Sequence, residues 1–188
     1  MHKQIMVKIP LFILLVCFHL SFEDDESPII DISTLADCED QKVPLPEGFT
    51  CETEISGEGE SKVLNAQVAI PFDVDNTIKY KATIKKWIDE KWQPLQFFLS
   101  GSVCEHVHKY LPGLWEKLSK FAGVPQDCPI KAGSYSVKGF TIQNLGSSDV
   151  KLPVLVPGKY LVSVLVIDKT DTPITCKQSE LTISKKHK

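Results

Sequence analysis

The chain has 188 residues, a formal net charge of −3, 43% hydrophobic residues and six cysteines. Without an excess of lysine and arginine it is not expected to bind nucleic acid, because neutralising phosphates requires clustered positive charge. Its length suits one domain with a sizeable core and is too short for two ordinary domains.

The N-terminus has the pattern of a secretory signal peptide, which we place at residues 1–22. Lys3 and Lys8 precede or flank the apolar run PLFILLVCFHL, which is too short to span a bilayer. The acidic FEDDESP that follows belongs to the mature side, so we expect cleavage between Cys17 and Glu23. No later segment has the roughly 18 consecutive apolar residues of a membrane helix. The mature protein is therefore expected to be soluble, secreted and extracellular.

The cysteines are interpreted in the light of this oxidising location, in which thiols tend to pair. Removal of the signal peptide leaves an odd number of cysteines: Cys38, Cys51, Cys104, Cys128 and Cys176. One thiol must then be free, linked to another chain, or lost through a different cleavage.

The mature chain begins with an acidic, turn-rich region that extends to about Ser61 and shows little periodicity. We expect it to be a loose segment that carries Cys38 and Cys51. The domain boundaries predicted from this pattern are an acidic lead-in at residues 23–37 and a folded domain at residues 38–184.

The clearest strand signal lies in TIKYKATIKKWI, where Ile78, Tyr80, Ala82 and Ile84 alternate with lysine and threonine. This alternation predicts a strand with one solvated face. KWQPLQFFL follows as a second extended piece, which Pro94 restricts to a sheet edge or a bend.

The pattern then changes to helical spacing. Between Val103 and Phe121, apolar residues recur at intervals of three and four, which predicts an amphipathic helix. Pro112 and Gly113 interrupt the pattern, so one helix or two short ones are both compatible with it.

Three further strands are predicted in the C-terminal part, at residues 135–142, 160–167 and 174–183, with a turn at Pro157 and Gly158. Both faces of the 160–167 strand are apolar, which is typical of a strand covered on both sides. Short strands with one helical connection predict a β-sandwich.

The motifs that could carry chemistry are weak. In CEHVH, His106 and His108 would point to different sides of a helix, so a disulfide cysteine beside two surface histidines is favoured over a zinc site. DVDN, at residues 73–76, lacks the glycine and glutamate of a calcium loop. Nucleophile-elbow, HExxH and phosphate-loop motifs do not occur. We therefore expect no enzyme activity, no metal and no cofactor.

The aromatic residues cluster in the middle of the chain. Each of them could simply fill the core. Trp87 and Trp92, however, lie among charges at a predicted strand end. There they could contact a lipid head group or border a cavity, or they could clamp a hairpin.

Four stretches together resemble a known family: GSVCEHVHKYLPGLWEKL, DCPIKAGSYSVKGFTI, KLPVLVPGKYLVSVLVIDK and TCKQSELTI. They are similar to the GM2-activator-like branch of the MD-2-related lipid-recognition (ML) family, and to its secreted insect members in particular. The resemblance implies an all-β fold, an immunoglobulin-like two-sheet β-sandwich with an apolar cavity and a short helical insert. It also implies two disulfides, Cys38 with Cys176 and Cys104 with Cys128, which leaves Cys51 unpaired.

This resemblance implies a secreted, non-enzymatic protein that shields or presents the acyl part of a lipid, or a hydrophobic signal molecule, in its cavity. The alternative is an extracellular interaction or chemosensory protein that binds a protein partner without a lipid. Contact with a membrane surface or a protein partner is a further expectation, as is a monomeric state. The residues expected at or near the cavity are Tyr80, Ile84, Phe98, Leu111, Leu114, Trp115, Phe121, Tyr135, Phe140, Val162 and Val164.

Overall fold

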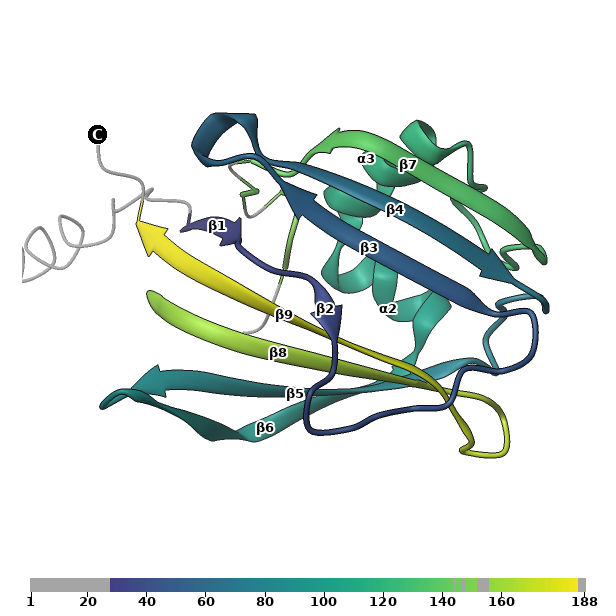
Figure 1. The fold of residues 1–188 in the computed structure, drawn as a ribbon, viewed down its shortest axis with the longest axis horizontal. Helices are drawn as coiled ribbons and strands as arrows, with labels where there is room; N and C mark the ends of the chain where they lie inside the picture. The colour runs from purple at the N-terminus through teal and green to yellow at the C-terminus, as the bar shows by residue number, and fades with distance from the viewer. Residues whose placement is uncertain (1–27, 144, 147, 152–155, 186–188) are drawn as a thin grey trace, which may run out of the picture.

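The computed structural model describes residues 28–143, 145–146, 148–151 and 156–185. The expected signal peptide at residues 1–22 lies outside the described residues. Within them, two antiparallel sheets and a pair of helices form the β-sandwich with a helical insert that was expected from the sequence (Figure 1). The fold class is therefore confirmed.

The larger sheet, called the large sheet below, has the strand order β1-β9-β8-β5-β6, and the short β2 pairs with β9 beside β1. All of its pairings are antiparallel. Its strands are β1 (Pro28–Ile32), β2 (Ala36–Asp37), β5 (Lys79–Ile88), β6 (Lys91–Ser102), β8 (Gly158–Ile167) and β9 (Pro173–Lys185).

The small sheet has the order β3-β4-β7, also antiparallel, with β3 (Thr50–Ser56), β4 (Val63–Ile70) and β7 (Gly133–Thr141). A single 3-10 turn, η1 (Gly59–Ser61), connects β3 to β4. Gly57, with φ of 81°, begins this connection, and a Cβ at that position would meet the backbone oxygen of Ser61. The tight turn therefore requires glycine there.

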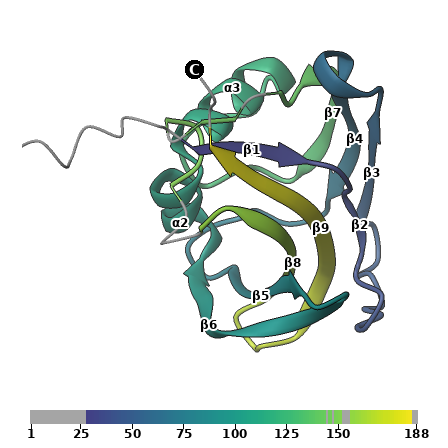
Figure 2. The same ribbon diagram turned by 90° about the vertical axis from the view of Figure 1, so that its left-hand side faces the viewer.

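Two helices connect β6 to β7, which settles the alternative left open by Pro112 in favour of two pieces. α2 (Val103–Tyr110) begins where the Ser102 hydroxyl accepts a hydrogen bond from the backbone N–H of Glu105. α3 (Pro112–Ala122) starts with proline and ends at Gly123, which has φ of 67°. Figure 2 shows α2 and α3 on one side of the molecule, with β3 and β4 on the other.

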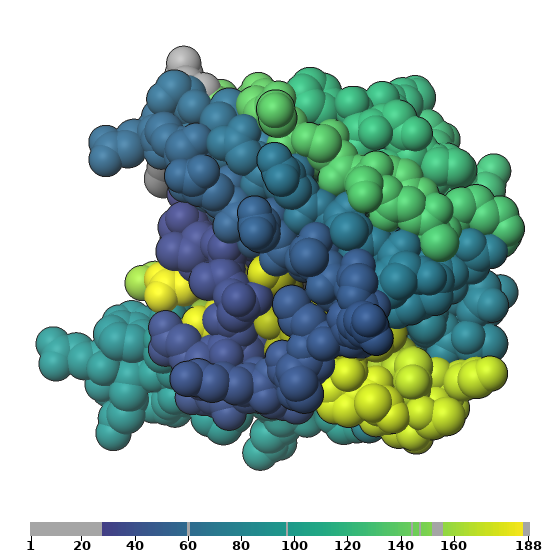
Figure 3. Space-filling model, turned by 45° about the vertical axis from the view of Figure 1, so that its right-hand side comes forward, coloured from purple at the N-terminus to yellow at the C-terminus, as the bar shows by residue number. Residues whose placement is uncertain are grey.

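The acidic N-terminal region is more ordered than expected, and the expectation of a loose segment up to about Ser61 is wrong. β1 and β2 pair with β9, and β3 is a full strand of the small sheet. Figure 3 shows these N-terminal residues, in purple and dark blue, on the same face as the yellow C-terminal strand. The reason is that backbone pairing with β9 and β4 orders these segments, and Ile30 of β1 is buried in the core.

Other strand predictions are confirmed. Ala82 and Ile84 are buried in β5, while Lys79 and Lys81 are exposed, as the alternation predicted. Both ends of β8 are buried, at Tyr160 and Leu161 and again at Ile167.

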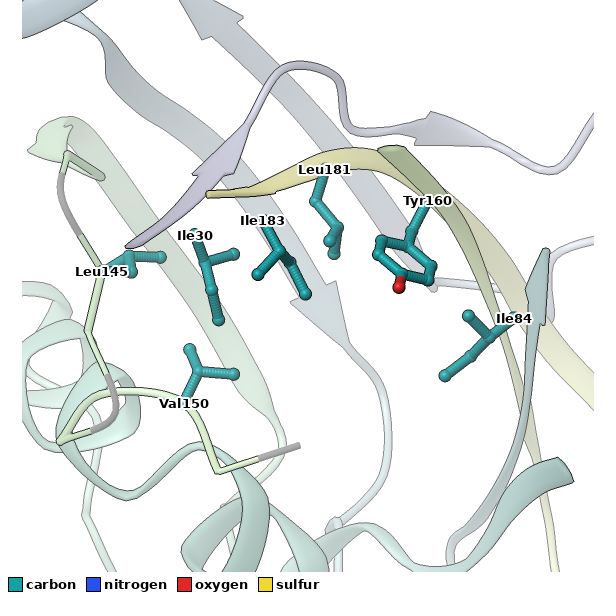
Figure 4. Packing of buried hydrophobic residues seen from close by; sticks show 7 residues of the cluster. All are labelled: Ile30, Ile84, Leu145, Val150, Tyr160, Leu181 and Ile183. Carbon is teal, nitrogen blue, oxygen red and sulfur yellow. The ribbon is translucent and has the colours of Figure 1, made fainter. Parts of the chain in front are cut away.

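The buried apolar residues of the described chain form three separate clusters. The first cluster joins β1, β5, β8 and β9 to the segment around Leu145 and Val150, as Figure 4 shows. The second cluster consists of Val74, Ile78, Cys104 and Ile174, and the third of Val137, Phe140 and Ile142. Ile32 and Leu114 pack against both the first and the third cluster, so the separation that positions the candidate site lies between the second and third clusters.

Candidate functional site

An apolar cavity of about 300 Å³ lies between the second and third clusters. Its wall includes Val74, Ile78 and Ile174 of the second cluster and Val137 of the third. Protein interiors are normally packed to the density of organic crystals, so a void of this size means that two parts of the core do not close on each other.

The small sheet supplies one wall. Leu64, Ala66, Val68 and Ile70 alternate along β4 and all line the cavity. Because successive side chains of a strand point to opposite faces, this spacing places all four on the inner face. On the neighbouring β7, Tyr135 lies opposite Val68 and also lines the cavity.

Helix α3 supplies the opposite wall. Trp115, Leu118, Ser119 and Ala122 line the cavity, and their spacing of three, four and seven places them on one helical face. One of the two expected disulfides helps to hold this helix, because Cys104 at the start of α2 is bonded to Cys128 after α3. The helical insert is therefore anchored at both ends while it covers the cavity.

Loop residues close the end of the cavity. The rings of Phe49 and Phe72 are stacked with centroids 6.4 Å apart, and both line the wall. Val74 and Ile130 lie side by side, since the N–H of each donates to the carbonyl oxygen of the other, at 2.8 and 3.0 Å. The segment after β4 and the segment before β7 are thus joined at one end of the small sheet.

Three polar groups of the wall already have protein partners. Trp115 Nε1 donates to the carbonyl oxygen of Gln126 at 2.9 Å, and the Tyr135 hydroxyl donates to that of Lys131 at 2.6 Å. The Ser119 hydroxyl donates to the carbonyl oxygen of Glu116 at 3.2 Å. Their hydrogen bonds are made to the backbone rather than into the cavity, so the space presents an almost entirely apolar surface.

Of the residues expected at the cavity, Trp115 and Tyr135 are part of its wall. Phe140 lies in the third cluster and makes an edge-to-face contact with Phe121, with ring centroids 5.4 Å apart. Phe121 is half exposed, at 52%. These two rings pack at the edge of the third cluster, next to the cavity wall residues Leu118 and Ala122.

Most of the other expected residues lie in the first cluster or beside it. Ile84 belongs to that cluster, and Leu111, Leu114 and Val162 pack against it. Val164 lies next along the same face of β8, opposite Ala82. The structure thus places these side chains in a packed region instead of in the described cavity wall.

Two expected residues lie elsewhere. Phe98 is 72% exposed, on the edge strand β6. Tyr80 is half-buried, and its hydroxyl lies 2.8 Å from Nδ1 of His106. Burial of the hydroxyl, together with nearby Tyr110, raises the pKa of Tyr80, so the phenol stays neutral at physiological pH.

The expectation for CEHVH and the disulfides can now be compared with the geometry. The pairs Cys38–Cys176 and Cys104–Cys128 are confirmed, and Cys51 is free. His106 packs edge-to-face against Tyr80 and Tyr110, with ring centroids 5.7 and 5.0 Å away. In the part of the chain that the structure describes, no three histidine, cysteine or acidic side chains gather in a way that could hold a metal ion.

Several wall residues were missed by the sequence reasoning, above all the four on β4 and the pair Phe49 and Phe72. The alternation in VLNAQVAI was a usable signal, because every second residue is apolar. The phenylalanines lie in irregular segments, where no periodicity predicts their direction.

No helix within the described residues is both long and apolar enough to cross a membrane.

Comparison with known proteins returns distant similarities. No protein-family model matches the sequence, and the search of curated proteins finds no match. Among solved structures, the chain is similar to chicken MD-1 complexed with lipid IVa, at 12% identity and a TM-score of 0.34, over 81% of this chain and 89% of the other. It is also similar to a Niemann-Pick type C2 protein from Japanese carpenter ant, at 15% identity and a TM-score of 0.24, over 85% and 96% of the two chains.

Proposed function

We propose that this protein is a non-enzymatic carrier that shields the apolar part of a lipid, or a hydrophobic signal molecule, in the cavity between α3 and the small sheet. The observation that carries the proposal is the cavity wall: it is apolar, and the polar groups of Trp115, Ser119 and Tyr135 are hydrogen-bonded to the backbone. Burial of a polar ligand group against such a wall is unfavourable, whereas burial of a hydrocarbon group is favourable.

The size of the cavity restricts the cargo. A volume of about 300 Å³ is at the lower end of the range of ligand pockets and about twice that of a cavity known to hold benzene. Burial of roughly 300 Å² of apolar ligand surface would contribute about 7 kcal/mol before the costs of association. One acyl chain or a compact hydrophobic molecule therefore fits better than a multi-chain lipid.

The composition of the wall supports a binding role over a catalytic one. Among the described residues that line the cavity there is no carboxylate, imidazole or thiol. General acid–base and nucleophilic catalysis both depend on such groups next to the substrate. The ligand would therefore be bound and released unchanged.

An extracellular setting is part of the proposal. The two disulfides, Cys38–Cys176 and Cys104–Cys128, are typical of proteins that fold in an oxidising compartment. In that setting a hydrophobic molecule needs a protein to keep it out of water, which is the task that the cavity suits.

The first test is native mass spectrometry of the protein secreted from eukaryotic cells, followed by organic extraction and identification of the released compounds. The expected result is a ligand present in a one-to-one ratio with the protein. An empty protein that also fails to take up fluorescent fatty acids or phospholipids would contradict the proposal and would favour the alternative, a protein partner without a lipid.

A matched pair of variants links the ligand to this cavity. Ala66→Phe fills the space from β4, and we expect it to weaken ligand uptake by about tenfold or more. Ala69→Phe places the same ring on the opposite face of β4 and should leave uptake unchanged. Equal effects of the two variants, with both proteins folded, would show that the ligand binds elsewhere.

A further inference from the structure

The hairpin of β5 and β6, called the ribbon below, has an unusual charge pattern. Its two strands, Lys79–Ile88 and Lys91–Ser102, contain five lysines and no aspartate or glutamate. The whole chain, in contrast, has more acidic than basic residues, 24 against 21. The ribbon is therefore a basic element of an acidic protein.

The same ribbon carries exposed apolar side chains. Large hydrophobic residues are exposed at six described positions, and three of these are on the ribbon: Trp87 at 42%, Ile88 at 38% and Phe98 at 72%. Trp87 and Phe98 lie on the outer face of the hairpin, whereas Ile88 follows Trp87 and points to the other face at the hairpin tip. Exposed apolar groups are ordinary when scattered, but two large rings on one face of a hairpin form a patch.

The patch lies on the outer face and free edge of the large sheet. β6 is the last strand in the order β1-β9-β8-β5-β6, and it lies at the lower edge of the sheet in Figure 1. Phe98 lies opposite Thr83, and Lys81 lies two residues before Thr83 on the same face. A lysine therefore borders the most exposed ring of the patch.

The tryptophans form the other end of the patch. Trp87 and Trp92 lie opposite each other with ring centroids 4.9 Å apart, and Lys159 Nζ lies 5.7 and 5.4 Å from the two centroids. The hairpin clamp considered from the sequence is thus present, yet Trp87 remains 42% exposed. An indole ring that is partly exposed beside cations suits the boundary between water and apolar material.

The lysines differ in how far their charges are already neutralised. Lys85 is bonded to Asp40 and Lys159 to Glu180, at 2.8 and 2.7 Å. Lys79, Lys81 and Lys91 are exposed and have no ion pair among the described residues. Opposing charge comes from Asp89 and Glu90, which occupy the turn at the tip of the hairpin.

We propose that the outer face of the ribbon docks on the surface of a bilayer that contains anionic phospholipid. Lys79 and Lys81 on this face would lie at the level of the head groups, and Phe98 and Trp87 would enter the boundary between head groups and acyl chains. Lysine can extend its charged end to the head groups while its aliphatic stem lies along apolar surface. The acidic turn at Asp89 and Glu90 favours docking with the flat face, since a tip-first insertion would push two carboxylates toward negative lipid.

The combination of features favours a membrane over an acidic protein partner. Lysines without ion pairs attract either one, but rings that stand exposed on a strand face, as Phe98 does, suit a lipid surface better than the packed core of a protein interface. A fluid lipid surface accepts such rings without shape complementarity. This inference goes beyond the proposed carrier function and does not depend on it.

The test is co-sedimentation of the full mature chain with vesicles of phosphatidylcholine alone or with roughly a third of phosphatidylserine, at about 0.05 M and about 0.5 M salt. We expect binding to the anionic vesicles at low salt, a weaker interaction at high salt, and little binding to phosphatidylcholine. Equal binding to both vesicle types, or no binding to either, would overturn the proposal, whether or not an acidic protein binds instead.

Lysine variants locate the charge. The double variant Lys79→Gln and Lys81→Gln should bind anionic vesicles about 25-fold more weakly, since each lysine near such a surface contributes about fivefold. The control replaces two other exposed lysines: Lys138→Gln and Lys169→Gln. Equal loss in both double variants would mean that net charge, and not the ribbon, determines binding, and would overturn the proposal.

Phenylalanine variants locate the apolar contact. Phe98→Ser should weaken binding to anionic vesicles by about tenfold, whereas Phe121→Ser on α3, also exposed, should not. Ligand occupancy measured by native mass spectrometry should be unchanged in the ribbon variants. Loss of vesicle binding with full ligand occupancy would show that the ribbon acts separately from the cavity. Vesicle binding that is unchanged in Phe98→Ser would contradict the proposed role of the ribbon.

Discussion

Lys117 Nζ on α3 lies 2.6 Å from Oδ1 of the buried Asp149. The other oxygen of the same carboxylate accepts the backbone N–H of Gly146, and the carbonyl oxygen of Asp149 accepts that of Leu114. The segment before β8 is thereby fastened to the N-terminal turn of the helix that covers the cavity, where the helix dipole also favours a negative charge.

The first prediction concerns acid stability. Burial alone would raise the pKa of Asp149, but the hydrogen bonds from Lys117 and Gly146 and the charge of Lys117 lower it overall below the usual 3.8. A lowered folded-state pKa gives stability that is present above pH 3.8 and is lost as the pH falls through the folded value. Asp149→Asn should therefore reduce the free energy of unfolding at pH 7 by about 1–3 kcal/mol, and by less at pH 3, as measured by urea denaturation.

The matched control is Glu116→Gln, which breaks the exposed i,i+4 pair with Lys120 on the same helix. An exposed pair is screened by water, so this variant should unfold as the wild type does at both pH values. A pH-independent effect of Asp149→Asn would mean that the carboxylate is held by packing and not by its charge.

The second prediction concerns the close approach of this segment to α3. A Cβ on Gly113 would lie 2.6 Å from the carbonyl oxygen of Ser148 and 2.8 Å from Oδ1 of Asp149. Gly113→Ala should cost about 1–3 kcal/mol of unfolding free energy although alanine favours helix. Gly146→Ala, where a Cβ would meet no atom within 4 Å, is the control. Thermal denaturation of both variants is the measurement, and a stable Gly113→Ala would show that the two segments can separate freely.

The third prediction separates the two disulfides. Cys38 and Cys176 are 138 residues apart, and Cys104 and Cys128 are 24 apart. Loop-closure entropy predicts that removal of the longer-range bond by a double Cys→Ser change costs about 5 kcal/mol, and removal of the shorter one about 3.5 kcal/mol. Ligand uptake should respond in the opposite order, because the shorter loop contains α3 and its cavity wall.

Guanidinium unfolding and a fluorescent fatty-acid assay, carried out on both double variants, give the two rankings. If removal of the Cys38–Cys176 bond abolished ligand uptake by a protein that still folds, and removal of the Cys104–Cys128 bond did not, the position of α3 would not determine ligand binding.

The fourth prediction concerns Cys51. The thiol is partly buried in β3, and burial raises its pKa, with smaller and opposing effects from Lys177 and Asp37. Since the thiolate is the reactive form, native Cys51 should react slowly with a thiol reagent at pH 8 and rapidly once the chain is unfolded. The measurement is the rate at which Cys51 reacts with a chromogenic thiol reagent, in buffer and in guanidinium.

The same property bears on oligomerisation through Cys51. A disulfide-linked dimer should not form under native conditions, and non-reducing gels of wild type and Cys51→Ser should be identical. A dimer band that disappears in Cys51→Ser would contradict this expectation.

The regular strands of the sandwich were predictable because their side chains alternate strongly. Ile78, Ala82 and Ile84 are buried as the alternation in the sequence indicated. In β3 the inward residues Cys51, Thr53 and Ile55 also alternate with glutamates, but two of the three are weakly apolar, so the period was not recognised.

The cavity was harder to predict than the sheets. Aromatic side chains such as Phe98 and Phe140 were expected to line it, but Phe98 is on the outer face of β6 and Phe140 packs in the third cluster. Which inward residues meet a void and which meet one another depends on how far the two sheets separate. This distance is set by packing between segments remote in sequence, and no local pattern encodes it.

The backbone hydrogen bonds of Trp115, Ser119 and Tyr135 give the cavity a chemical preference of its own. A hydroxyl group added to a bound hydrocarbon chain would cost about 1–3 kcal/mol wherever it met the apolar part of the wall and not a hydroxyl such as that of Thr175. Each methylene, in contrast, contributes about 0.8 kcal/mol where space remains. The pocket would therefore hold a saturated hydrocarbon chain more tightly than the same chain carrying a hydroxyl group at the apolar wall.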